Sequence, residues 1–334
     1  MRTLYDAVQK ELRRVDFDAI WPGFEPVPFA LVGRKDQVYL ENGEIPLGDR
    51  FWANTVIEYE GKPLATWCID NPEEEDVQML ASNMVHEMFH ALHDTLWKKE
   101  GANEFALMSY PDDLTAYRIK AAEIKLLARA YTESDHDALN DFINLRKSRA
   151  KLLGDAIIDE YLSETGEGTA EYAGLCALKQ LSPDKFEKHL REHHLSKLSN
   201  PGEELFSVRV MSYYTGAVLC LALKKLGVDF YQYLSDSLPL FEAIASKDSI
   251  ADDFEKYYSA KKVRFDDFLA SNTTVIEKSA KITGFDPMNM WRMGDRVFCS
   301  YFVNLNGESY NEAVMLNMVP GSEREVESII VRNG

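Results

Sequence analysis

The residues with the clearest chemistry are two histidines and a glutamate in the segment His86–His90, which reads HEMFH. Positions four apart on an α-helix share one face, so His86 and His90 can direct two ring nitrogens at one metal ion. Glu87 is close enough to hold a metal-bound water but is angled away from the metal itself. Two imidazoles, a carboxylate base and an open position are what a hydrolytic zinc site requires. We therefore predict His86 and His90 as zinc ligands and Glu87 as the catalytic base; the alternative is two helix histidines with polar partners.

A helix must hold these residues, and the sequence predicts one over 72–100. Asn71 is a suitable N-cap, Pro72 suits the first helical position, and three glutamates follow where the helix dipole favours negative charge. Gly101 follows as a stop. Apolar residues recur at helical spacing along the segment: Val77, Leu80, Ala81, Met84, Val85, Met88, Leu92 and Leu96.

Two histidines do not complete a zinc site, and the segment Glu167–Tyr172, which reads EGTAEY, supplies the best candidates for a third ligand. Glu167 and Glu171 are four residues apart, so both face the same way on a helix. Two like carboxylates repel each other unless a cation or a histidine N–H lies between them. One zinc ligand and one carboxylate that orients a ligand histidine would satisfy both. The alternative is two solvated helix acids.

The two motifs together resemble those of the gluzincin branch of zinc metallopeptidases. The resemblance implies that Glu167 is the third zinc ligand and that Glu171 holds the first histidine, His86. In gluzincin aminopeptidases a Tyr-x-x-Gly-Ala segment also supplies a tyrosine that donates to the oxyanion forming on the attacked carbonyl. Aligned on the Gly-Ala pair at 216–217, that residue is Tyr213.

The chain departs from the family in one spacing, because His90 and Glu167 are 77 positions apart, much further than in the best-known gluzincins. Helical periodicity over 114–131 and 138–153 predicts that the insertion is itself a helical hairpin. The long spacing leaves several assignments open. The open alternatives are Glu164 and Glu171 as the third ligand, Asp94 as the orienting acid, Tyr214 as the oxyanion donor, and Arg209 for binding a substrate carboxylate or carbonyl.

A second histidine pair, His193-His194, has a different spacing. Neighbouring positions on a helix point about 100° apart, so the two rings cannot easily share one metal. We therefore expect this pair at the surface.

Bulk properties restrict the partners. The chain of 334 residues has a formal net charge of −18 and no run rich in Lys or Arg, which argues against nucleic acid as a partner. No window holds about 18 uninterrupted apolar residues, and the first residues lack the apolar core of a signal peptide. We expect a cytoplasmic protein without a membrane partner. The four cysteines lie far apart and form no C-x-x-C pair, as expected of reduced, buried thiols.

The distribution of β-rich and helical segments along the sequence predicts an α+β fold of zincin type. Residues 27–70 are β-rich with a hairpin turn at 60–63, residues 72 to about 269 are helical, and residues 271–334 return to β-rich sequence. In the zincin arrangement the metal helix packs beneath a small sheet, whose edge strand can accept an extended peptide. We expect a metallopeptidase domain over 1–270 and a β-rich segment or small accessory domain over 271–334.

These observations predict zinc-dependent hydrolysis of a peptide or protein substrate, with one zinc ion per chain. Two alternatives are a catalytically silent zincin-fold protein with a binding or regulatory role, and a metal-dependent hydrolase of a non-peptide substrate. Glu87 favours catalysis, because a structural metal has no use for a base beside it. A fourth protein ligand, such as His93, would favour a structural metal. The sequence indicates neither the oligomeric state nor the cleavage specificity.

Overall fold

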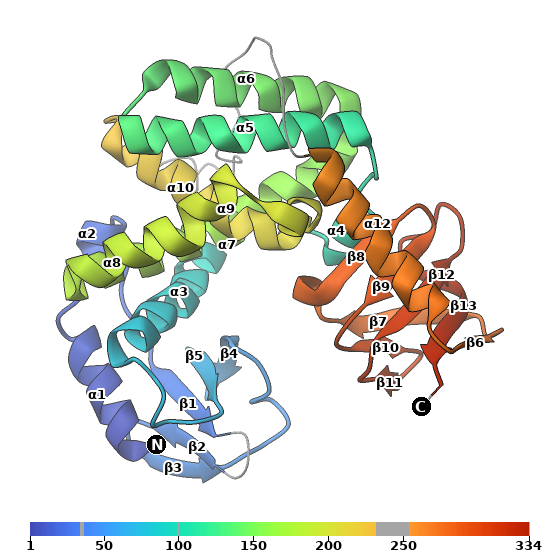
Figure 1. Ribbon diagram of the computed structural model, residues 1–334. Helices are drawn as coiled ribbons and strands as arrows, with labels where there is room; N and C mark the ends of the chain where they lie inside the picture. Colours follow the sequence, from blue (N-terminus) through green and yellow to red (C-terminus); the bar gives the residue numbers. More distant parts are fainter. Residues whose placement is uncertain (34–36, 99, 232–253, 334) are drawn as a thin grey trace. The chain divides into compact units, whose positions relative to one another are not determined.

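The computed structural model describes residues 1–33, 37–98, 100–231 and 254–333 (Figure 1). It confirms the α+β class, with a small N-terminal sheet, a set of helices and a C-terminal β-rich sheet. The expected boundary at 270 stays a prediction, and the part of the expected helical body over 232–253 lies outside the described residues. By their internal contacts the residues form two compact units: unit 1 (Met1–Glu100, Glu164–Ser196 and Tyr213–Glu242) and unit 2 (Gly101–Ser163, Lys197–Ser212 and Ala243–Gly334).

The N-terminal sheet belongs to unit 1 and has five strands in the order β3-β2-β1-β5-β4. Strand β1 pairs parallel with β5, and the other neighbours pair antiparallel. The expected hairpin joins β4 to β5, and its turn residues Glu60 and Gly61 both have positive φ (51° and 76°), as a two-residue hairpin turn requires. The strands are β1 (Phe29–Gly33), β2 (Gln37–Leu40), β3 (Gly43–Pro46), β4 (Thr55–Tyr59) and β5 (Lys62–Ile69).

Helix α3 (Val77–Leu96) carries His86, Glu87 and His90. It contacts strands β4 and β5 and also helix α1 (Arg2–Leu12). Apolar residues recur along one face of α3, and this face is buried. The histidine pair lies at the edge of the buried face.

The prediction that this helix begins at residue 72 is wrong, because it begins at Val77. The Asp76 side chain accepts hydrogen bonds from the backbone N–H groups of the second and third helical residues, at 3.0 Å and 3.1 Å, and so caps the helix. Asn71 forms a turn instead, in which its side-chain oxygen accepts from the backbone N–H of Glu73. The helix also ends before residue 100, at Leu96.

Two further helices contribute to unit 1. Helix α7 (Ile158–Leu181) carries Glu167 and Glu171, and helix α10 (Val208–Lys225) carries the two tyrosines at 213 and 214. Their residues from 164 and from 213 onward belong to this unit. A third helical run consists of α8 (Pro183–His189), a π-helical turn (Leu190–Leu195) and α9 (Ser196–Ser199).

Glycines let these helices approach closely. A Cβ atom at Gly174 of α7 would lie 3.0 Å from the backbone oxygen of Ser82 on α3, and the Ser82 hydroxyl donates to the Gly174 carbonyl at 2.8 Å. A Cβ atom at Gly216 of α10 would lie 2.4 Å from the Glu164 backbone oxygen and 2.6 Å from the Gly168 Cα. Because these distances are below normal contact for a carbon atom, α7 can pack this closely only with glycine at 216.

Unit 2 contains most of the insertion between His90 and Glu167, namely Gly101–Ser163. Helices α5 (Leu114–Glu133) and α6 (His136–Leu153) lie side by side as a hairpin (Figure 1), as the periodicity predicts. Other helices of this unit within the described residues are α4 (Glu104–Met108), α12 (Phe254–Ala270) and the 3-10 turns Gly154–Ile157, Gly202–Phe206 and Pro287–Asn289. Among the helices of the described residues, none is both long enough and apolar enough to cross a membrane.

The C-terminal sheet also belongs to unit 2, with the strand order β11-β10-β7-β13-β12-β9-β8 and with β6 paired to β13. Its side chains alternate between two cores. Phe298 and Met315 pack with Phe268 of α12, whereas Leu316 packs in a second cluster with Met108 of α4. The strands are β6 (Thr273–Ile276), β7 (Ala280–Phe285), β8 (Met290–Met293), β9 (Arg296–Cys299), β10 (Val303–Leu305), β11 (Glu308–Tyr310), β12 (Val314–Met318) and β13 (Glu325–Arg332).

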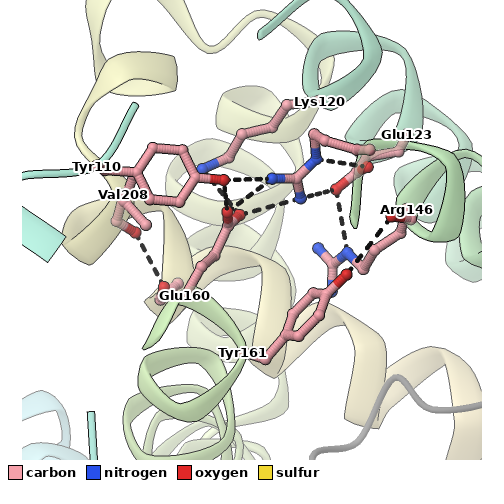
Figure 2. Close-up of polar contacts among 9 residues, drawn as sticks. Tyr110, Lys120, Glu123, Arg146, Glu160, Tyr161 and Val208 are labelled. Atoms are coloured by element: carbon pink, nitrogen blue, oxygen red, sulfur yellow. Dashed lines mark hydrogen bonds and ion pairs between the residues drawn. The ribbon is translucent and has the colours of Figure 1, made fainter. Parts of the chain in front are cut away.

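Five charged side chains are buried together in unit 2 (Figure 2): Lys120 and Glu123 of α5, Arg146 and Arg149 of α6, and Glu160 of α7. Arg149 bonds both acids, with Nη2 2.5 Å from Glu123 Oε1 and Nη1 2.6 Å from Glu160 Oε2. The Arg146 Nε donates to Glu123 at 3.0 Å, and the Lys120 Nζ lies 3.0 Å from Glu160. Three buried cations therefore depend on two carboxylates.

Replacing Glu160 by Gln is expected to lower the free energy of unfolding by about 3–5 kcal/mol, because it leaves Lys120 and Arg149 buried without this counter-charge. The measurement is urea denaturation followed by circular dichroism at neutral pH. Glu133→Gln is the matched control on α5, since its carboxylate is 64% exposed. That change should cost less than about 0.5 kcal/mol, and equal effects of the two substitutions would contradict the role given to the cluster.

The same variants test how the free energy of unfolding depends on pH. Burial alone raises the pKa of Glu160, but the charges of Arg149 and Lys120 outweigh burial and hold the pKa well below its usual range. A carboxylate with a lowered pKa stabilises the fold above its unfolded pKa, about 4.3, and this contribution is lost as the pH falls. Between about pH 5 and pH 3, wild-type stability should therefore fall more steeply than that of Glu160→Gln, and Glu133→Gln should follow the wild type.

Candidate metal centre

The structure brings His86, His90 and Glu167 together within unit 1. The Glu167 Oε2 lies 3.6 Å from the His86 Nε2 and 3.5 Å from the His90 Nε2. The imidazoles come from successive turns of α3, with ring centroids 5.1 Å apart, and the carboxylate comes from α7. One side-chain nitrogen or oxygen of each residue lies within 4.8 Å of the others.

These separations can be compared with the lengths of hydrogen bonds and with the spacing of zinc ligands. An N–H···O hydrogen bond is about 2.7–3.2 Å long. Two ligands of a tetrahedral zinc ion, each bound at about 2.0–2.1 Å, lie about 3.4 Å apart. The observed 3.5 Å and 3.6 Å are closer to the ligand spacing. The three side chains therefore fit a shared zinc ion, and two histidines with one glutamate are a donor set that zinc accepts.

Glu171 contacts the other ring nitrogen of His86. Its Oε2 lies 3.0 Å from the His86 Nδ1, so the carboxylate accepts a hydrogen bond there and leaves the Nε2 facing Glu167. Burial alone lowers the pKa of His86, but the carboxylates of Glu167 and Glu171 outweigh burial and raise the pKa to about 10. The surroundings of this imidazole thus favour a positive charge, which is what a cation site requires.

Glu87 is buried on the same helix as the two imidazoles. Burial raises the pKa of Glu87, and the charges of His86 and His90 counteract part of that rise. A carboxylate with a raised pKa accepts a proton more readily near neutral pH, which suits proton exchange with a water molecule.

The two tyrosines of α10 contact different histidines. The Tyr213 ring stacks on His86, with centroids 5.8 Å apart and planes at 7°. The Tyr214 ring meets His194 edge-on, with centroids 5.5 Å apart and planes at 90°. Tyr213 is therefore the tyrosine beside a candidate ligand, and Tyr214 contacts a histidine outside the group of three.

The other candidate residues lie elsewhere. Asp94 is 80% exposed, and its carboxylate is 4.0 Å from the Nδ1 of His93. Arg209 belongs to unit 2, where it pairs with Glu104 at 3.3 Å, so its proposed contact with a substrate stays a prediction. In the part of the chain that the structure describes, the group around His86 and His90 includes neither His93 nor Glu164.

The prediction that His193 and His194 both lie at the surface is wrong for His194. His193 is exposed, but His194 is only 1% exposed, and its Nε2 lies 2.8 Å from the Glu171 Oε1. The cause is the π-helical turn over Leu190–Leu195, whose wider hydrogen bonding changes which residues face inward. The α-helical spacing assumed for this segment does not hold, and no residue pattern in it marks a π turn.

Comparison of the chain with known protein families, curated proteins and solved structures found no match. The resemblance to gluzincins rests on the motif residues and stays a prediction. The function proposed below depends on the geometry of the centre.

Gly216→Ala should lower both stability and zinc affinity, because the new Cβ would meet the α7 backbone at 2.4 Å and displace the helix that carries Glu167. Such overpacking costs about 1–3 kcal/mol, measured by urea denaturation, and zinc affinity is measured by competition with a chromophoric chelator. Gly166→Ala is the matched control on α7, since a Cβ there meets nothing within 4 Å. It should be neutral or stabilise by up to about 1 kcal/mol. Unchanged stability in Gly216→Ala would contradict the close packing.

Proposed function

We propose that this protein is a zinc-dependent hydrolase that cleaves peptide bonds. The observation that carries the proposal is the spacing of 3.5 Å and 3.6 Å between the Glu167 carboxylate and the two imidazoles, which suits a shared zinc ion better than hydrogen bonds. Among the described residues the group has three members, His86, His90 and Glu167. Catalytic zinc sites have three protein ligands, whereas structural sites have four.

Zinc held by these residues would supply Lewis acidity, which polarises a carbonyl group and makes water more acidic. Glu87 accepts a proton from the attacking water as the water oxygen bonds to the carbonyl carbon. Glu87 then gives that proton to the amide nitrogen as the C–N bond breaks. Tyr213, whose ring lies against His86, donates its O–H to the carbonyl oxygen as negative charge develops there.

The N-terminal sheet favours a peptide substrate over a non-peptide one. Strand β4 is the last strand in the order β3-β2-β1-β5-β4, and it contacts α3, the helix that carries the two histidines. An edge strand offers backbone N–H and C=O groups with which an extended peptide can pair. This arrangement provides a way to hold a peptide backbone within the unit that contains the candidate metal centre.

Two substitutions test the metal and the base separately. Glu167→Ala should lose zinc, because two imidazoles leave the ion under-coordinated. Glu87→Gln should keep zinc, since the amide has the same shape, but should lower cleavage by about 10²–10⁴-fold because it cannot accept a proton. Zinc content is measured by atomic absorption and cleavage by mass spectrometry of a mixed peptide library. Full activity of Glu87→Gln refutes the mechanism, and a zinc-loaded wild type without cleavage favours a catalytically silent binding protein.

Tyr213→Phe should reduce kcat by about 10²–10³-fold with little change in KM or zinc content, because the lost hydrogen bond matters only in the transition state. Steady-state kinetics on a peptide found in the library screen provide the measurement. Tyr214→Phe is the matched control, which keeps the ring that meets His194 and should be nearly neutral. A reversal of the two results would make Tyr214 the donor.

A further inference from the structure

His194 contacts the acid that orients His86. The His194 Nε2 lies 2.8 Å from the Glu171 Oε1, while the other oxygen of the same carboxylate lies 3.0 Å from the His86 Nδ1. One carboxylate thus joins two imidazoles, from α3 and from the π-helical turn. The His194 side chain is 1% exposed and that of Glu171 is 24% exposed, so the contact is shielded from water on the histidine side.

The same cluster has the composition of a second metal site, because Glu171, His189 and His194 place side-chain nitrogens or oxygens within 4.8 Å of one another. The distances favour hydrogen bonds instead. The 2.8 Å between Glu171 and His194 is shorter than the roughly 3.4 Å that separates two ligands of one zinc ion. At the centre formed by His86, His90 and Glu167 the corresponding distances are 3.5 Å and 3.6 Å. The cluster of Glu171, His189 and His194 therefore has the spacing of hydrogen bonds, whereas the group of His86, His90 and Glu167 has a spacing that suits a metal ion.

The chemistry of the groups fixes the direction of both hydrogen bonds. An ionised carboxylate can only accept, so His86 donates from its Nδ1 and His194 donates from its Nε2. A neutral His86 then carries its lone pair on the Nε2, the nitrogen that lies 3.6 Å from Glu167. Glu171 thereby fixes the ring tautomer that a metal ligand needs.

We infer that His194 is a positioning residue for the metal centre: by donating to Glu171, it holds that carboxylate in the orientation that presents His86 to zinc. The inference rests on the proposed function, since it requires zinc at His86. Glu171 has several rotatable bonds, and a hydrogen bond to each oxygen restricts their rotation. His194 is itself restrained by ring contacts with Tyr214 at 5.5 Å and His189 at 5.3 Å. Its influence on the metal therefore passes through one carboxylate.

Zinc affinity of the full chain tests this role. His194→Phe keeps a ring but removes the donor, and His193→Phe makes the same change at the exposed neighbouring position. Dissociation constants are measured by competition with a chromophoric chelator. His194→Phe should raise the Kd by about 10–100-fold, as loss of a partner that orients a ligand does, and His193→Phe should leave it unchanged. His194→Gln, which retains an N–H donor, should recover most of the affinity.

A double-mutant cycle separates positioning through Glu171 from a general loss of structure. In a Glu171→Gln background the carboxylate is already gone, so His194→Phe should change the Kd by less than about threefold. An equal fold-change in both backgrounds overturns the inference, as does equal weakening by His194→Phe and His193→Phe. If His194→Phe does not have the circular dichroism spectrum of the wild type, His194→Leu takes its place in the cycle.

Failure of this inference and failure of the proposed function give different results. A wild-type protein that binds no zinc overturns both. Tight zinc binding by the wild type together with an unaffected His194→Phe variant overturns the role of His194 and leaves the proposed function standing.

Discussion

The candidate metal centre depends on how closely helix α7 approaches helix α3. Two carboxylates on successive turns of α7 meet two imidazoles on successive turns of α3 only when the helix backbones nearly touch. Gly174 permits this approach, because a Cβ there would lie 3.0 Å from the Ser82 backbone oxygen and 3.4 Å from the His86 Cβ. The Ser82 hydroxyl then bonds the Gly174 carbonyl at 2.8 Å. A displacement of a few tenths of an ångström would change the spacing of the candidate ligands, so the close approach that Gly174 permits matters as much as their identity.

Two clusters of charged and polar groups differ in the spacing of their side chains. In unit 2 the contacts among the five buried charges span 2.5 Å to 3.1 Å, which is within the range of hydrogen bonds between charged groups. Each acid there is compensated by protein cations alone. In the candidate metal centre, Glu167 stands 3.5 Å and 3.6 Å from two imidazoles, which is longer than an ordinary hydrogen bond and close to the spacing of shared zinc ligands. The first cluster contains its own cations, whereas the spacing in the second would suit an additional cation.

The parts that sequence predicts well are those set by local spacing. The HEMFH segment and the helical hairpin over 114–153 follow from helical periodicity, and the β4–β5 hairpin follows from its Glu-Gly turn. The sequence does not locate the start of α3, because Asn71 and Asp76 are both suitable caps and the structure uses Asp76. It does not place His194, because a π-helical turn changes the facing of residues without altering their spacing in the sequence. Helical periodicity predicts individual helices but not how they pack. It therefore does not predict that the segments beginning at residues 164 and 213 fold into one unit with the first hundred residues.

His86 and His90 are equivalent in the motif but not in the fold. The His86 Nδ1 is held by Glu171, its ring is stacked on Tyr213, and its Cβ lies against the α7 backbone at Gly174. Its side chain is 10% exposed, compared with 23% for His90. A ligand restrained on three sides fixes the position of a metal, and a more exposed ligand can adjust to that position. In the proposed centre His86 would therefore be the ligand that sets the geometry, and it is also the histidine at which the hydrogen-bond chain from His194 ends.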